Sequence, residues 1–318
     1  MTARIVGSAL AAVGATAAAA FAWGALVERN RFTVRRETVP ILEPGAEPVR
    51  ILHLSDIHLA PWQHAKQEWI RSLTELHPDL IVSTGDNVGH VDTLPALAFT
   101  LEAFRGVPGV FVHGSNDYVG PVLKNPFGYF SERRSTTDNA HNIDTASLEA
   151  HYDSLGWHDL NNGAVAIALG GSRLEFVGVG DAHQGWDKLH ELPGILDELR
   201  EDVDWGDDRE GIEPVTIGLT HAPYKRVLNS FVNHSADLIL AGHTHGGQVR
   251  VPGIGALVAN CDIPLDQASG LSIWQHGRGS SYLNVSAGLG TSIFAPVRFA
   301  CPPEAVLLTL TGNDFGYP

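Results

Sequence analysis

Residues 236–245 read ADLILAGHTH, an apolar run that ends in two histidines set one residue apart. An apolar run of this length that is closed by glycine is typical of a buried strand rather than a helix. His243 and His245 therefore follow a strand, and a pair of loop histidines between glycines lowers stability unless something binds it. Three alternatives are open within this stretch: solvated loop residues, a proton relay and metal ligands.

Four further stretches have the same form, a short apolar run followed by carboxylate, amide or imidazole side chains. They are VRILHLSDIH (49–58), PDLIVSTGDN (78–87), GVFVHGSND (109–117) and PVTIGLTHAP (214–223). The amphipathic stretches QEWIRSLTELH (67–77) and LPALAFTLEAF (94–104) between them predict helices, so the order of elements indicates an α/β fold. In open α/β sheets the carboxyl ends of the strands line the ligand crevice, and residues that follow five strands can meet there.

The residues that end these runs are all of metal-ligand types. A single SDIH or THAP is typical of a turn or a helix cap, but five such endings together are hard to explain as turns. Oxygen and imidazole ligands without thiolate suit Mn²⁺, Fe²⁺, Zn²⁺ or Co²⁺, and a carboxylate can bridge two ions. Two such ions can polarise a phosphoryl oxygen and hold a bridging hydroxide as the nucleophile.

The order of the motifs resembles the calcineurin-like metallophosphoesterase superfamily, whose pattern runs D-x-H, GD, GN-H, H and GH-x-H. Here the motifs stand as DIH, GDN, GSND, TH and GHTH between Val49 and Leu310. The segments GHTHGGQ (242–248) and RFACPPE (298–304) are similar to a bacterial membrane-associated or exported branch of that superfamily. The resemblance implies a four-layer α/β-β/α sandwich of two mixed β-sheets flanked by helices.

The resemblance also implies a ligand set for two divalent metal ions. The first ion would be held by Asp56, His58 and His245, Asp86 would bridge, and the second would be held by His221, His243 and an amide from the third motif. The third motif departs from the pattern. An ungapped match puts Ser115 at the amide position, whereas a shift by one residue makes Asn116 the ligand, which we prefer because serine is a poorer neutral ligand for these ions.

In either alignment no histidine follows the asparagine to protonate the leaving group. His141, in the polar stretch YFSERRSTTDNAHNID (129–144), is a candidate general acid, with a solvated loop histidine as the alternative. A leaving group of low pKa tolerates this loss best, which favours a phosphodiester or pyrophosphate substrate. Asp181 and His183, in GVGDAHQGWDK (178–188), lie outside the family's ligand set and are expected to order a turn.

The N-terminal segment has an uncharged stretch from Ile5 to Val27, about the length of a membrane-spanning helix. Residues 1–28 are therefore predicted to be a transmembrane anchor, with a signal peptide as the alternative because of the alanine-rich end. Arginines at 29, 31, 35 and 36 follow the stretch, which favours a cytoplasmic catalytic domain by the positive-inside rule. The proline-rich stretch PILEPGAEP (40–48) is predicted to be an extended linker or an edge strand, and residues 29–48 as a whole are predicted to be a linker into a single catalytic domain (49–312).

The composition restricts the partners. A formal net charge of −15 argues against binding nucleic acid or anionic lipid through basic patches, so a phosphate ligand needs local cations. Two cysteines, Cys261 and Cys301, exclude a disulfide framework and a cysteine-rich zinc site, and leave either one disulfide or two free thiols.

The sequence thus predicts a membrane-anchored hydrolase of phosphoester bonds that uses two divalent ions and a metal-bound hydroxide. Location and family analogy suggest a lipid-linked or envelope substrate. The alternatives are a phosphomonoesterase with the same site and a non-catalytic, membrane-anchored metal-binding scaffold.

Overall fold

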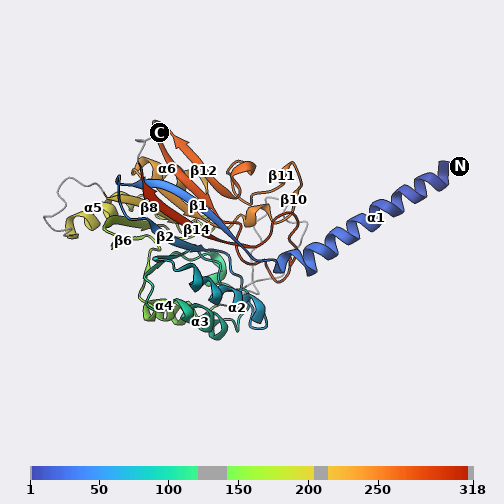
Figure 1. Ribbon diagram of the computed structural model, residues 1–318, viewed down its shortest axis with the longest axis horizontal. Coiled ribbons are helices and arrows are strands. Elements are labelled where there is room, and N and C mark those ends of the chain that lie inside the picture. The colour runs from blue at the N-terminus through green and yellow to red at the C-terminus, as the bar shows by residue number, and fades with distance from the viewer. Residues whose placement is uncertain (1, 121–141, 204–213, 314–318) are drawn as a thin grey trace.

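The structure is a computed structural model that describes residues 2–120, 142–203 and 214–313 (Figure 1). A long N-terminal helix, α1 (Thr2–Leu26), projects from a body that is built on two β-sheets. His141 lies outside the described residues, as does most of the polar stretch that contains it.

The first sheet has six strands in the order β1-β14-β2-β3-β4-β5. Strands β2 to β5 run parallel to one another, and β14 lies antiparallel to β2 and parallel to β1. The bounds are Thr33–Leu42 for β1, Val49–Leu54 for β2, Leu80–Ser83 for β3, Gly109–Phe111 for β4, Trp157–Asp159 for β5 and Glu304–Gly312 for β14.

The second sheet also has six strands, in the order β12-β13-β9-β8-β7-β6. Its centre is parallel, and an antiparallel strand closes each edge. The bounds are Gly163–Leu169 for β6, Ser172–Gly178 for β7, Val215–Thr220 for β8, Leu238–Ala241 for β9, Gly270–His276 for β12 and Gly279–Val285 for β13. A separate two-stranded hairpin is formed by Arg250–Val251 (β10) and Gly255–Ala256 (β11).

Helices cover the outer face of each sheet, which gives the four layers that the sequence predicts. The bounds are His64–Ser72 for α2, Leu94–Leu101 for α3, Thr145–Ser154 for α4, Leu192–Asp202 for α5 and Lys225–Asn233 for α6. Short 3₁₀ turns are Glu28–Asn30 (η1), Leu73–Leu76 (η2), Glu102–Phe104 (η3), Ser115–Asp117 (η4), His245–Gly247 (η7) and Leu265–Gln267 (η8).

The alternation of side chains along the strands explains the layers. In β3, Leu80 and Val82 pack into the core between the two sheets, while Ile81 points to the core under α2, α3 and α4. In β9, Leu240 faces the other sheet and Ile239 faces the core under α5 and α6. Strands β3 and β9 are both buried on two faces, which is why their sequences are continuous apolar runs.

The structure corrects the expected linker over residues 29–48. Thr33–Leu42 forms β1, the edge strand of the first sheet, and it pairs in parallel with β14. Pro40 lies in this strand, where an edge position tolerates the missing N–H donor. Half of the expected linker is therefore strand, and the first sheet begins at Thr33, well before Val49.

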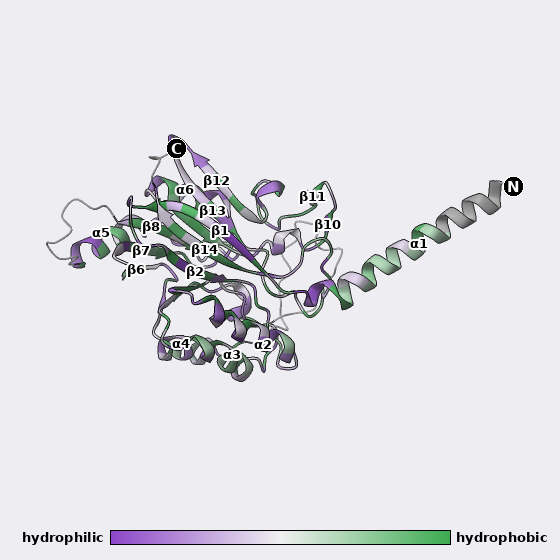
Figure 2. Cartoon of the chain, viewed as in Figure 1, coloured by the Kyte–Doolittle hydropathy of each residue, from purple (hydrophilic) through white to green (hydrophobic). Residues whose placement is uncertain are grey.

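Helix α1 is the one described helix that is long and apolar enough to cross a membrane, by length and composition. Figure 2 shows hydrophobic residues along its described part, and 11% of the apolar window is buried against the body. Both cysteines, Cys261 and Cys301, are free thiols.

Candidate metal centre

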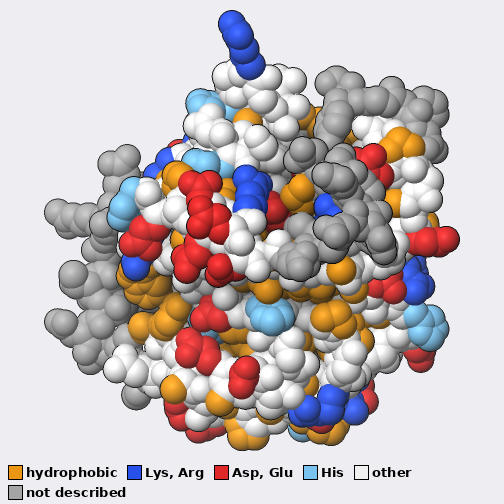
Figure 3. All heavy atoms as spheres, turned by 90° about the vertical axis from the view of Figure 1, so that its left-hand side faces the viewer, with side chains coloured by type: hydrophobic (Ala, Val, Ile, Leu, Met, Phe, Trp, Pro, Cys, Tyr) orange, Lys and Arg blue, Asp and Glu red, His pale blue; other side chains and the backbone are white. Residues whose placement is uncertain are grey.

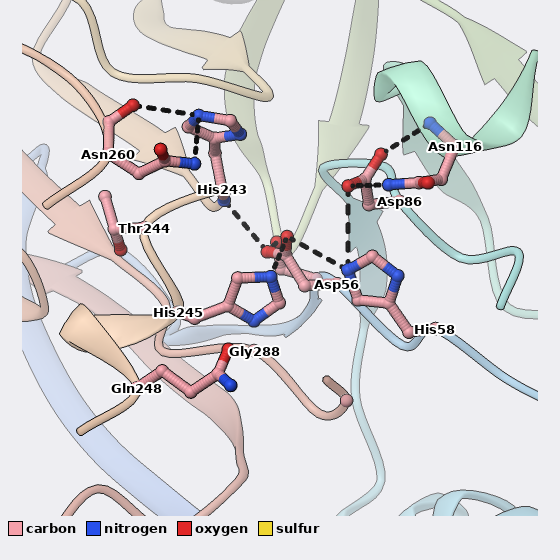
Figure 4. Close-up of polar contacts among 12 residues, drawn as sticks. Asp56, His58, Asp86, Asn116, His243, Thr244, His245, Gln248, Asn260 and Gly288 are labelled. Carbon is pink, nitrogen blue, oxygen red and sulfur yellow. Dashed lines mark hydrogen bonds and ion pairs between the residues drawn. The ribbon is translucent and has the colours of Figure 1, made fainter. Parts of the chain in front are cut away.

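The side chains that end five of the strands meet at the junction of the two sheets. The first sheet contributes Asp56 and His58 after β2, Asp86 after β3 and Asn116 after β4; the second contributes His221 after β8 and both His243 and His245 after β9. Figure 4 shows most of these side chains pointing toward one another. The structure thus brings together every described residue of the predicted ligand set.

Asp86 lies between the two halves of the cluster. Its Oδ2 atom is 3.6 Å from His58 Nε2 and 3.6 Å from His221 Nε2. A carboxylate oxygen at equal distance from two imidazole nitrogens of different strand ends can serve as a bridging ligand. Asn116 holds this carboxylate, since its backbone N–H donates to Oδ1 (2.9 Å) and its side-chain amide lies 2.6 Å from Oδ2.

On one side of Asp86, Asp56 Oδ1 lies 3.7 Å from His245 Nε2 and 4.0 Å from His58 Nε2. On the other side, the Nδ1 atom of His243 is 3.2 Å from His221 Nε2. Donor atoms around one transition-metal ion at about 2.1 Å are separated by roughly 3–3.5 Å. Two groups have donor atoms that all lie within 4.8 Å of one another, slightly wider than this spacing, namely Asp56 with His58 and His245, and Asp56 with Asp86 and His221.

Several donor atoms in the cluster have no partner in the protein. Asp56 Oδ1 and His58 Nε2 are buried without a hydrogen bond, whereas Asp56 Oδ2 accepts from the His243 backbone N–H and the Ser55 hydroxyl. Buried polar atoms are nearly always satisfied, and an exception needs an explanation. A cation at this place satisfies both atoms.

The histidine tautomers also fit a cation. The Nδ1 atom of His221 lies 2.7 Å from the Thr84 carbonyl oxygen, and the Nε2 atom of His243 lies 3.2 Å from the Asn260 carbonyl oxygen. A carbonyl oxygen only accepts, so these two ring nitrogens carry the protons. When both rings are neutral, the lone pairs of His221 Nε2 and His243 Nδ1 face each other, which is the arrangement of ligands oriented by outer hydrogen bonds.

The charges of the site favour a cation. Burial raises the pKa of Asp56 to about 6, and the charge of Asp86 adds to this. Burial opposes the charged form of His221, but the carboxylates of Asp86, Asp181 and Asp56 outweigh it and raise its pKa to about 9. Burial also lowers the pKa of His58 to about 4. Three buried carboxylates with one cationic imidazole leave negative charge that a divalent ion can neutralise.

The backbone is strained where the ligands are attached. Residues with positive φ and a side chain are uncommon, and they cluster at functional sites. Five predicted ligands have this conformation: Asp56 (48°), His58 (40°), Asp86 (54°), His243 (66°) and His245 (50°). A Cβ atom at Gly242 would meet Ser55 Oγ and Asp56 Oδ2, so this motif glycine is needed for the close approach of the two sheets.

The third motif brings the asparagine amide to the cluster. Asp117 is turned away, because its two oxygens accept N–H groups from the backbone of residues 86–88 and 114. Asn116 is therefore the third-motif residue whose side chain reaches the Asp86 carboxylate. Among the described residues, the Ser115 hydroxyl makes no hydrogen bond to any of the predicted ligands. The ungapped alternative, in which Ser115 is the ligand, therefore has no support from the geometry.

Two residues that the sequence analysis assigned to a turn lie beside the site. Asp181 does order a turn, since its Oδ1 accepts the His183 N–H, but the residue is fully buried and its Oδ2 has no partner. Burial raises its pKa to about 6, and it interacts electrostatically with His221 and Asp86. The ring centroid of His183 is 4.6 Å from that of His243. The signal was in the sequence, because LEFVGVGD (174–181) is another apolar run that ends in a carboxylate.

His53 and His113 are buried, as expected of packed histidines. His53 lies 2.8 Å from the Thr84 hydroxyl and 3.0 Å from the Asn284 amide, which pairs both ring nitrogens. His113 lies 3.7 Å from Asp117, on the side of the third motif that faces away from the cluster.

Comparison with protein-family models identifies the chain. Residues 49–247 match the model described as calcineurin-like phosphoesterase. The chain belongs to this family. The matched region begins at β2 and ends just after the GHTH motif, so it holds every predicted ligand.

Curated relatives of this phosphoesterase carry matching names. It is 24% identical over 296 residues to "Uncharacterized metallophosphoesterase YkuE" of Bacillus subtilis, with 91% of this chain and 87% of the relative covered. It is 27% identical over 313 residues to "Phosphodiesterase YaeI" of Escherichia coli, with 95% and 97% covered. A bovine relative, "Transmembrane protein with metallophosphoesterase domain", is 27% identical over 232 residues, with 70% and 46% covered.

The family membership has two direct consequences. The phosphoesterase is a hydrolase that acts on phosphoester bonds, as the sequence predicts. Its cluster of carboxylate and imidazole donors is a candidate site for the divalent metals on which metallophosphoesterases depend.

Proposed function

We propose that the protein is a phosphodiesterase that uses a dinuclear metal centre. The observation that carries this proposal is the position of Asp86 Oδ2, at 3.6 Å from both His58 Nε2 and His221 Nε2. His58 belongs to the Asp56 and His245 group, and His221 belongs with His243. One carboxylate therefore serves two sets of nitrogen donors, which a single ion would not require.

The residues of the site have distinct roles in this proposal. Asp56, His58 and His245 would hold one ion, His221, His243 and Asn116 would hold the other, and Asp86 would be shared by both. When bound, the ions supply Lewis acidity to the phosphoryl group and lower the pKa of water for nucleophilic attack. Asn116 also orients the bridging carboxylate through its two hydrogen bonds to Asp86.

A diester or pyrophosphate substrate is favoured by the third motif. No histidine follows Asn116 to protonate the leaving oxygen, and Asp117 is fully occupied by backbone N–H groups. A leaving group of low pKa departs without strong acid assistance. The name of the Escherichia coli relative, a phosphodiesterase, agrees with this preference.

We also propose that α1 anchors the enzyme to a membrane and that its substrate is lipid-linked. The apolar window Ala11–Asn30 supports the anchor, and the bovine relative is named as a transmembrane protein. The signal peptide is the alternative for this segment.

The dinuclear proposal is tested by elemental analysis of the full chain beside Asp86→Ala. We expect close to two metal ions per chain, with loss of metal and of bis-aryl phosphate turnover together in the variant. Asp92→Ala is the matched control, because the Asp92 side chain is 80% exposed and only faces His90. One ion or none in the parent chain, or turnover that is unchanged in Asp86→Ala, contradicts the proposal.

A further inference from the structure

Exposed hydrophobic side chains gather on two loops that follow the GHTH motif. They are Val249 (43% exposed), Ile254 (77%), Leu257 (55%), Val258 (36%) and Phe294 (43%), and we call them the apolar rim. Single exposed apolar residues are ordinary, but a contiguous group marks a surface that binds a partner or a membrane.

The two loops of the apolar rim are joined to each other. Val249 forms a β-bridge with Phe299, and the Arg250 N–H donates to the Phe299 carbonyl at 2.8 Å. The side chain of Gln248 donates to the Ala295 carbonyl at 2.8 Å, one residue from Phe294. The β10-β11 hairpin and residues 294–299 therefore form one surface.

The apolar rim is also next to the metal centre. Gln248 follows the ligand His245 by three residues, and Figure 4 shows the two side chains on neighbouring parts of the same turn. The Cys301 thiol, at the end of the second loop, lies 3.4 Å from the His245 carbonyl. A surface that covers the apolar rim therefore lies beside His245 and the rest of the candidate metal centre.

The end of helix α1 is fixed to the same loops. The Arg298 N–H donates to the Gly24 carbonyl at 3.2 Å. Glu28 accepts the Cys301 N–H at 2.7 Å with one carboxylate oxygen and the Trp23 indole N–H at 2.8 Å with the other. Because β1 begins at Thr33, little chain separates the helix from the body, and the helix is docked rather than loosely tethered.

The length of α1 determines how near a membrane must lie. Its 25 residues extend about 37 Å at 1.5 Å per residue. A bilayer has a hydrocarbon core of about 30 Å, so a spanning α1 leaves roughly one turn outside the core. Loops that contact Gly24 and Glu28 then lie at the depth of the lipid headgroups.

The distribution of charge agrees with this orientation. Figure 1 shows the β10-β11 hairpin on the side of the body from which α1 projects. Figure 3 shows the face turned away from α1, where acidic side chains gather. An acidic protein is repelled by anionic headgroups, and this arrangement keeps that acidic surface far from the bilayer.

We propose that the apolar rim inserts into the surface of the lipid bilayer that α1 spans. The proposal rests on the membrane anchor of the proposed function and deepens it. The metal centre then opens at headgroup depth, where the phosphoester of a lipid is located, and a lipid-linked substrate reaches the site without leaving the membrane. The apolar rim is thus covered by the lipid bilayer and not by a protein partner.

The test uses the full chain in phosphatidylcholine nanodiscs, with an environment-sensitive fluorophore on Ile254→Cys in a Cys261→Ser background. Lipids with a quencher on the acyl chain should quench this fluorophore. The matched control is Ile273→Cys, since Ile273 is 40% exposed on the edge strand β12, and we expect no quenching there. Equal fluorescence with and without quencher at both positions, on chains that remain in the nanodisc, overturns the docking and leaves the anchor intact.

Failure of the anchor gives a different result. A chain that elutes apart from the nanodisc overturns both the anchor and the docking, whatever its activity. A doubled particle mass without quenching identifies a second copy of the chain as the occupant, which also overturns the proposal.

A second measurement avoids labels. The triple variant Ile254→Ser, Leu257→Ser, Phe294→Ser should hydrolyse a water-soluble diester as the parent does and lose turnover severalfold on a vesicle-embedded diester. Equal loss on both substrates indicates damage to the site instead and contradicts the docking.

Discussion

At the scale of single residues, the strain in the ligand backbone has a measurable consequence. His245 has a φ of 50°, a conformation in which a Cβ atom costs about 1–2 kcal/mol. His245→Gly and His245→Ala both remove the imidazole, but the glycine variant also removes the strain. We expect the free energy of unfolding of the glycine variant to be higher by about 1 kcal/mol, measured by denaturant unfolding without metal.

Glu68, an exposed residue inside α2, provides the control for this comparison. There the order should reverse, with glycine about 1 kcal/mol less stable than alanine. If His245→Gly also has a lower free energy of unfolding than His245→Ala, the positive φ is not maintained by the surrounding structure, and the strain argument is wrong.

The third motif gives a second prediction at this scale. Asn116→Ala removes the amide that lies 2.6 Å from Asp86 Oδ2. We expect metal affinity to fall by at least the roughly 10–100-fold that follows loss of an outer-shell partner, as measured by calorimetric titration. Ser115→Ala is the matched control and should bind metal as the parent does. If Ser115→Ala lowers the metal affinity and Asn116→Ala does not, Ser115 is the ligand and the ungapped alignment is the correct one.

The sequence could predict which side chains gather at the junction of the sheets because they end five apolar runs, and the pattern Asp-x-His, Gly-Asp and Gly-His-x-His can be read locally. Asp181 was assigned only to a turn, although its apolar run ends in a carboxylate as the motif runs do, because it lies outside the ligand pattern. Its burial without a hydrogen bond to Oδ2 and its electrostatic interaction with His221 are set by the fold and cannot be read from a short motif. Likewise, the choice between Ser115 and Asn116 depends on loop geometry.

At the scale of elements, the strands that end in the motif residues (β2, β3, β4, β8 and β9) could be predicted because two-sided burial requires continuous apolar runs. Of strand β1, only the last residues, 40–42, lie in the stretch expected to be a linker or an edge strand, and the rest was not recognised. Its partner β14 begins at Glu304, so the pairing of Thr33 with Glu304 joins positions at opposite ends of the chain. Arg35 and Glu37 form an ion pair within the strand, which makes an edge strand look like a polar linker.

The junction of β8 and β9 supports a prediction on pH dependence. Asp237 precedes β9 and accepts the Thr216 N–H at 2.9 Å; burial raises its pKa to about 6. A raised pKa means that the folded state binds the proton more tightly than the unfolded state. This contribution to stability is present below the unfolded pKa of about 4 and is lost as the pH rises through about 6.

Asp237→Asn keeps a side-chain oxygen for the Thr216 N–H and removes the titration. We therefore expect the variant to gain stability over the parent as the pH rises from 4 to 7, with no gain at pH 4, measured by thermal unfolding at each pH. Asp79 lies in the corresponding place before β3, where its carboxylate accepts the Arg50 N–H. The variant Asp79→Asn therefore provides the control. A constant difference between parent and Asp237→Asn at every pH would contradict the assignment.

At the scale of the whole molecule, the metal centre is a link between the two sheets. The first sheet provides Asp56, His58, Asp86 and Asn116, and the second provides His221, His243 and His245. Bound ions would add to an interface that is made by apolar packing and by a few hydrogen bonds, such as that between His53 and Asn284, and they would satisfy the unpaired donors Asp56 Oδ1 and His58 Nε2. Metal binding should stabilise the entire fold, because the unfolded chain cannot hold seven separated ligands together.

This link predicts the effect of metal removal. A ligand at 1,000 times its dissociation constant adds about 4 kcal/mol of stability, and each kcal/mol shifts the melting temperature of a domain of this size by about 2–4 °C. We expect a chelator to lower the melting temperature by roughly 10 °C in the parent chain and to have little effect on Asp86→Ala, which has lost the bridge. The variant should also melt below the metal-loaded parent and close to the chelated one. An equal chelator effect in both chains would mean that the stabilising ions bind elsewhere, and that the two sheets are held together without them, by the apolar core and the hydrogen bonds between the sheets.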